Sequence, residues 1–146
     1  MEICTTGTSG ITAERFFLQL KSEGVTSIVD TRMHPSSQLA GYSKKESLKY
    51  FANEILGIDY IHEPLLCPEP ALLKDYRNET IDWNQYKTSY TNLLRARKLK
   101  ANLNTSRWGS KPVLLCSEEN PEHCHRRLAA EFLKTYILKV DRIGHL

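Results

Sequence analysis

Short apolar segments alternate along the chain with longer segments in which apolar residues recur at helical spacing. Residues 25–29 give the clearest short segment, a β-branched run with little alternation, which is typical of a strand buried on both faces of a sheet. Four further segments are predicted as strands by their apolar content. The five predicted strands are residues 2–5, 25–29, 58–62, 112–116 and 138–143.

Helices are expected to connect these strands. Gly24 and Gly57 are suited to end the first two helices, because glycine adopts the left-handed conformation that is common at that position. The third is a long amphipathic helix that extends to about Lys100. Residues 63–81 are interrupted by prolines and are compatible with only one or two helical turns, at residues 71–76, and residues 102–111 are predicted to form a surface loop. Helix starts are predicted at Thr12, at a capping box over residues 43–46, at Asp82 and at Asn120–Pro121.

The alternation of strands and helices over the whole chain predicts the fold class. It favours one α/β domain over residues 1–146, with three layers (α/β/α) and a mostly parallel sheet of about five strands, similar to Rossmann or flavodoxin folds. The length of 146 residues, with 40% hydrophobic and 25% charged residues, fits a globular domain and excludes collagen and low-complexity chains.

Composition also limits the compartment and the partners. No apolar run is long enough to cross a bilayer, and the first residues lack the basic and apolar stretches of a signal peptide, so we expect a cytoplasmic protein with no membrane partner. Lys and Arg number 20 and Asp and Glu 17, which gives a net charge of +3. That charge permits an anionic partner without requiring nucleic acid. The four cysteines are expected to be free thiols, and the oligomeric state is left open.

Polar residues gather where three of the predicted strands end. Ligands of open parallel sheets bind beyond the carboxyl ends of the strands, so we expect these side chains to form one site. Acid–base roles fall to Asp30, Glu118 and His125, because carboxylates and imidazole are the usual groups for proton transfer. The predicted substrate-binding residues are Thr6, Ser9, Arg32, Ser37, Cys116, Cys124 and Arg126.

Five short motifs occur in order along the chain: Thr6-Gly7-Thr8-Ser9, Asp30-Thr31-Arg32 with Pro35 and Ser37, Cys116-Ser117-Glu118, Cys124-His125-Arg126 and His145-Leu146. In this combination the chain resembles the family called domain of unknown function 488, and Cys-x-Glu followed by Cys-His-Arg is the most specific part. The chain departs from the family pattern at residues 65–68, where Leu-Gly-Gly is usual, and at Thr8, where histidine is common. The resemblance implies a compact α/β domain of bacteria or archaea, and it supplies no reaction.

Most of these groups also have a purely structural interpretation. Asp30 and Arg32 form either a site pair or an ion pair that holds a loop in place. His125 and Arg126 either meet an anion at a helix start or pack against the sheet. Residues 6–10 form either a phosphate cradle or an ordinary tight turn.

The cysteines leave three alternatives open. Cys116 and Cys124 are buried free thiols, or one of them is a nucleophilic thiolate, or both bind zinc together with His125. The Cys-x5-Arg loop of phosphatases is absent, and the spacing is not the paired Cys-x2-Cys of structural zinc sites. Adjacent residues on a helix point about 100° apart, which separates Cys124 from His125. We therefore predict no metal and no cofactor.

Together these observations predict a small enzyme, a hydrolase or a transferase, that acts by acid–base chemistry at the carboxyl edge of the strands. Its substrate is expected to be a phosphate-bearing, nucleotide-like small molecule or a nucleic acid, with Arg32 and Arg126 holding the anion. The alternative is a non-catalytic module that binds the same class of ligand without turnover.

Overall fold

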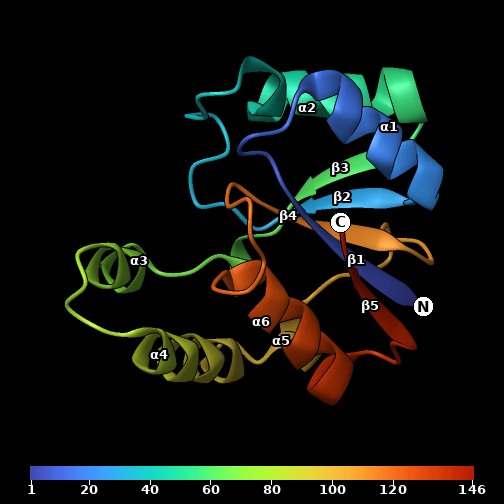
Figure 1. The fold of residues 1–146 in the computed structure, drawn as a ribbon. Helices are drawn as coiled ribbons and strands as arrows, with labels where there is room; N and C mark the ends of the chain where they lie inside the picture. The colour runs from blue at the N-terminus through green and yellow to red at the C-terminus, as the bar shows by residue number, and fades with distance from the viewer.

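The computed structural model describes the whole chain, residues 1–146. Five parallel strands form one sheet in the order β3-β2-β4-β1-β5, with helices on both of its faces (Figure 1). The predicted α/β fold class with three layers is confirmed. The strands are β1 (Glu2–Gly7), β2 (Ser27–Asp30), β3 (Asp59–His62), β4 (Pro112–Cys116) and β5 (Arg142–His145).

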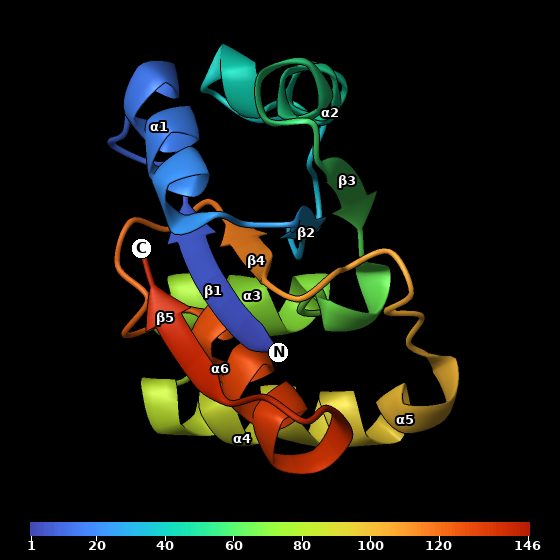
Figure 2. The ribbon, with the colours of Figure 1, turned by 90° about the vertical axis from the view of Figure 1, so that its right-hand side faces the viewer.

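Helices α1 and α2 cover one face of the sheet, and α3 to α6 lie on the other (Figures 1 and 2). None of them is long and apolar enough to span a bilayer. The π-helical turns η2 and η4 continue α2 and α6, and η1 and η3 are 3-10 turns. The bounds are α1 (Ala13–Glu23), η1 (Gly41–Ser43), α2 (Lys45–Phe51), η2 (Ala52–Leu56), η3 (Pro64–Leu66), α3 (Pro70–Arg77), α4 (Trp83–Ala96), α5 (Leu99–Asn102), α6 (His125–Phe132) and η4 (Leu133–Ile137).

The central strand β4 is buried along its whole length. Its neighbouring residues point to opposite faces of the sheet, as in any strand. Val113 and Leu115 pack into the core beneath α1 and α2, whereas Leu114 packs into the core shared with α4 and α6. This two-sided burial is the reason that the strand has a continuous apolar sequence without alternation.

Several predicted helix boundaries are confirmed by their caps. Thr12 Oγ1 accepts a hydrogen bond from the Arg15 N–H at 3.3 Å, and α1 ends at Gly24, which has φ 64°. Asp82 and Gln85 form a reciprocal capping box at the start of α4. Each contact satisfies a backbone group that the helix leaves unpaired at its end.

The predicted start of the last helix at Asn120 is wrong. Asn120 Oδ1 accepts a hydrogen bond from the Glu122 N–H at 2.8 Å, and the Cys124 N–H donates to Pro121 O at 3.3 Å, so these residues form turns. Helix α6 begins at His125, and Cys124 precedes it in an extended conformation with φ −132° and ψ 140°. Asparagine followed by proline therefore caps a turn here instead of a helix.

Two other predicted helix features are also corrected. The capping box over residues 43–46 is absent, because Ser43 is buried in η1 and its hydroxyl donates to Ala40 O at 2.8 Å. Lys44 is the N-cap of α2, with no side-chain hydrogen bond. The long helix toward Lys100 is interrupted at Lys98, whose φ of 50° separates α4 from α5.

The last strand begins later than residue 138. The Leu138 N–H still donates to Leu133 O at 2.8 Å and thus closes the preceding helical turn, so β5 starts only at Arg142. Strand β5 pairs with β1. His145 Nδ1 lies 2.7 Å from Thr5 Oγ1 across that pair.

Candidate functional site

A cavity of about 1510 Å³ opens where β2 and β4 end. Its walls come from residues 8–12 after β1, from parts of the segment 32–43 after β2, from α3 and from the loop 116–125. This is the edge at which parallel α/β sheets bind their ligands. The volume exceeds the roughly 300–1,000 Å³ of ordinary small-molecule sites, so the cavity has room for a ligand with several chemical groups.

A buried ion pair lies behind one wall of this cavity. Arg32 Nε and Nη2 donate to the two carboxylate oxygens of Asp30 at 2.8 and 2.7 Å, and the exposed fractions of the two residues are 3% and 0%. The Tyr60 hydroxyl donates to Asp30 Oδ2 at 2.5 Å, and Arg32 Nη2 also donates to Ser43 O at 2.7 Å. Arg32 Nη1 is buried and has no partner, although Arg32 lines the cavity.

Burial and the ion pair act in opposite directions on the pKa of Arg32. Burial alone would lower the pKa of Arg32, but the hydrogen bonds and the negative charge of Asp30 outweigh burial and raise that pKa. Burial also raises the pKa of Tyr60, and the nearby carboxylate raises it further. Arg32 is therefore a permanent cation held in one orientation, and Tyr60 is a permanent donor.

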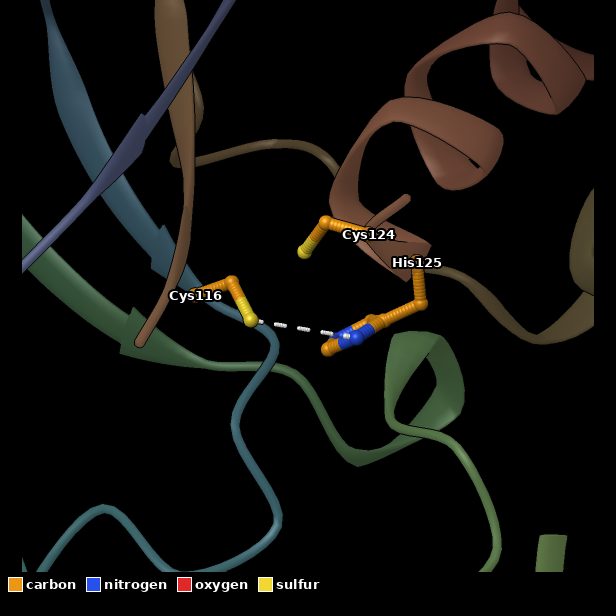
Figure 3. A group of neighbouring side chains, drawn as sticks. All are labelled: Cys116, Cys124 and His125. Carbon is orange, nitrogen blue, oxygen red and sulfur yellow. Dashed lines mark hydrogen bonds between the residues drawn. The ribbon is translucent and has the colours of Figure 1, made fainter. Parts of the chain in front are cut away.

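Two cysteines and one histidine line the cavity and lie side by side, as Figure 3 shows; we call these three residues the floor of the cavity. Cys116 is the last residue of β4, Cys124 precedes α6, and His125 is the first residue of α6. Their exposed fractions are 5%, 2% and 6%. Cys116 Sγ lies 3.8 Å from His125 Nδ1, while His125 Nε2 lies 3.0 Å from both Thr31 O and Thr31 Oγ1.

The three floor residues perturb one another's protonation. A hydrogen bond with Cys124 lowers the pKa of Cys116 well below its ordinary value, and His125 adds to this effect while burial opposes it. The same contact and burial raise the pKa of Cys124. Burial is the largest influence on the pKa of His125 and lowers it, but the charge of Cys116 and the hydrogen bonds with Cys116 and Thr31 together outweigh burial, so the net direction is upward. The contact therefore favours the thiolate at Cys116 and the protonated thiol at Cys124.

Arg126 lies inside the protein and does not line the cavity. Its exposed fraction is 0%, and its guanidinium donates to the backbone oxygens of Glu118 and Glu119. Gly7 lies directly against this contact, because a Cβ added there would be 1.8 Å from Glu118 O. Arg126 therefore positions the loop that follows β4.

Comparison with known families identifies the chain. The model of the family described as "Domain of unknown function DUF488" matches residues 12–133. The chain belongs to the DUF488 family. No curated protein and no solved structure matches the chain.

The matched region of this DUF488 domain contains both the buried ion pair and the floor of the cavity. Glu118 is on the rim, where its carboxylate is about half exposed and lies 3.9 Å from Arg77 Nη2. Thr6, Asp30 and Arg126 do not line the cavity and are buried. The predicted site residues that line it are Ser9, Arg32, Ser37, Cys116, Glu118, Cys124 and His125.

Two residues that shape the DUF488 site were not predicted. Tyr60 reaches Asp30 because β3 pairs with β2, and no sequence pattern specifies which strands are neighbours. Thr31 holds the His125 ring. Its place between Asp30 and Arg32 was a signal, since a residue at a strand end between two site candidates lies at the same edge of the sheet.

Proposed function

We propose that this DUF488 domain is an enzyme that binds a phosphate-bearing, nucleotide-like or nucleic-acid substrate in the cavity and acts on it by acid–base chemistry. The observation that carries the proposal is the unpartnered Nη1 of Arg32. A buried donor without an acceptor costs about 1–3 kcal/mol, and more when it is charged. An anionic ligand in the cavity that accepts this hydrogen bond removes the cost.

Asp30 acts in this proposal as a positioning residue. It accepts hydrogen bonds from the Arg32 backbone N–H, from Nε and from Nη2, in addition to the Tyr60 hydroxyl. Its carboxylate is therefore fully engaged, and it fixes the guanidinium plane so that Nη1 is the nitrogen left for a ligand. A pre-oriented guanidinium suits phosphate, whose oxygens accept its planar donors.

The remaining wall supplies polar contacts and proton transfer. Ser9 and Ser37 are exposed hydroxyls on the cavity wall, and Glu118 is a half-exposed carboxylate on the rim that is free to approach a substrate. Both ring nitrogens of His125 face protein groups, so it acts with the two cysteines beside it rather than alone. The volume of the cavity favours a nucleotide or a nucleic-acid end over inorganic phosphate.

The test combines binding and turnover on a panel of nucleotides and short oligonucleotides. We expect calorimetry to show at least tenfold weaker binding for Arg32→Lys than for the wild type. We also expect Glu118→Gln to retain binding and to lose about 100-fold in kcat. Arg107→Lys is a matched control, because Arg107 pairs with Asp59 on the surface, away from the cavity.

Ser9→Ala and Ser37→Ala keep the proposal testable if Arg32→Lys fails to fold, because both serines are exposed on the wall. Weaker binding in these variants supports the assigned cavity. Binding that all the cavity variants leave unchanged overturns it. Binding without turnover of any compound in the panel refutes the enzyme and leaves the non-catalytic binding module.

A further inference from the structure

Three side chains of types that commonly bind metals, those of Cys116, Cys124 and His125, lie close together (Figure 3). The ligand atoms of Cys116, Cys124 and His125 all lie within 4.8 Å of one another, and Cys116 Sγ is 3.8 Å from His125 Nδ1. Tetrahedral zinc, with bonds of about 2.3 Å to sulfur and about 2.0 Å to nitrogen, spaces such atoms roughly 3.5–3.8 Å apart. We propose that these three residues bind Zn²⁺ and leave its fourth position open to the cavity.

The backbone explains how two adjacent residues contribute to one site. On a continuous helix Cys124 and His125 would point about 100° apart. Helix α6 begins only at His125, and Cys124 has extended backbone angles. The change of conformation between the two residues turns both side chains toward Cys116 at the end of β4, as Figure 3 shows.

Hydrogen bonding selects the ring nitrogen that faces the metal. The Thr31 hydroxyl donates its hydrogen to Leu115 O at 2.8 Å, so its oxygen can only accept from His125 Nε2. Thr31 O, which also faces Nε2, is an acceptor as well. Nε2 therefore carries the proton of the neutral ring, and the lone pair of Nδ1 points toward the cysteines. Metal-binding histidines are typically held in this way by a second hydrogen bond.

The donor set indicates both the metal and the kind of site. Two thiolates and an imidazole suit zinc, whereas magnesium and calcium require oxygen ligands. Structural zinc sites are closed by four protein ligands, while catalytic sites have three and keep one position for water or substrate. Here three protein donors converge, and all three residues line the cavity.

The chemistry of such a site fits the cavity. Binding requires both thiols to lose their protons, and the two thiolates then neutralise the charge of Zn²⁺. Water in the fourth position has a pKa lowered to about 7, so it provides a hydroxide nucleophile near neutral pH. This use of the fourth position rests on the proposed function, whereas metal binding itself rests on the geometry alone.

Elemental analysis of untagged protein, purified without chelators, tests the site directly. We expect roughly one zinc per chain in the wild type, and loss of the metal in Cys116→Ser and Cys124→Ser. Cys67→Ala is the matched control, because Cys67 Sγ also lies 3.8 Å from a histidine, Nε2 of His62, without a third donor. Circular dichroism of each variant confirms that it is folded.

A second measurement does not depend on metal retention during purification. Cobalt added to metal-free protein should give the intense visible absorption of tetrahedral coordination and a thiolate charge-transfer band. Thr31→Val, which leaves all three ligands in place but removes one acceptor from Nε2, should weaken zinc binding about tenfold.

The inference is overturned if wild-type protein binds zinc no more tightly than Cys116→Ser, or if Cys67→Ala loses as much metal as the cluster variants. It is also overturned by a cobalt spectrum without tetrahedral or thiolate bands. Zinc binding without turnover of any substrate leaves the site intact and refutes only the proposed function. Turnover by metal-free protein supports the proposed function and overturns the use of the fourth position for the nucleophile.

Discussion

Replacing Asp30 with asparagine tests the buried ion pair behind the cavity. The substitution keeps the size of the side chain but removes its charge. The carboxylate accepts four hydrogen bonds, two at each oxygen, and in the variant an NH2 group faces two of these donors. Arg32, 3% exposed, is then left as a buried cation without a counter-charge. Removing one partner of a buried pair typically costs about 3–5 kcal/mol, and we expect this value for Asp30→Asn.

Urea unfolding of the reduced protein measures this loss, since the midpoint falls while the slope stays constant if the native state is otherwise unchanged. For a chain of this size the expected drop in Tm is on the order of 10 °C. The double variant Asp30→Asn/Arg32→Met removes both charges and should recover at least about 2 kcal/mol relative to the sum of the single variants. Tyr60→Phe is the matched control, because it deletes only one hydrogen bond to Asp30.

A loss below about 1 kcal/mol in Asp30→Asn would refute the reasoning, because that is the value for an exposed ion pair. Strict additivity of Asp30→Asn and Arg32→Met would also refute it, since residues that share two side-chain hydrogen bonds must be energetically coupled.

Three further predictions follow from contacts elsewhere in the fold. Gly7→Ala should lower the free energy of unfolding in urea by about 1–3 kcal/mol through overpacking, whereas Gly41→Ala, with nothing within 4 Å of the added Cβ, should be near neutral. Equal effects of the two substitutions would contradict the close approach of Gly7 to the Glu118 carbonyl. Arg126→Met should increase amide hydrogen exchange around Glu118, whose backbone oxygen it no longer holds; unchanged exchange would show that the loop needs no such support. Burial, aided by the charge of Arg126, lowers the pKa of His145, so the folded state resists protonation of this residue and loses stability as the pH falls below about 6.5. His145→Gln should flatten that part of the curve of unfolding free energy against pH. An unchanged curve would contradict the downward direction of the pKa.

The local sequence predicted those elements whose ends are set by one or two residues. The Thr12 cap and Gly24 bound α1, and the capping box at Asp82 starts α4, because these contacts involve residues close together in the chain. The helix start predicted at Asn120 was wrong because that signal is also local: an asparagine side chain caps a turn and a helix by the same kind of hydrogen bond. Only the packing of α6 onto the sheet determines which of the two forms.

The sequence predicted where the candidate site lies, but it did not predict which of the charged side chains face the cavity. Asp30, Arg32, Cys116 and His125 come together because the ends of parallel strands share one edge. Whether a charged side chain points into the cavity or into the protein depends on partners that are distant in sequence. Arg126 has such partners in the loop backbone, and a single sequence carries no signal for that contact.

The order of the strands also affects how the chain folds during synthesis. Strand β1 is made first, yet both of its neighbours, β4 and β5, are made only after residue 111. Until then only β2 and β3 can pair, and β1 leaves the backbone N–H and C=O groups of both its edges unpaired on the nascent chain. Such delayed, long-range pairing slows folding and favours aggregation of incomplete chains. A fragment that ends before β4 should therefore fail to fold, although it contains most of the helices that cover the sheet.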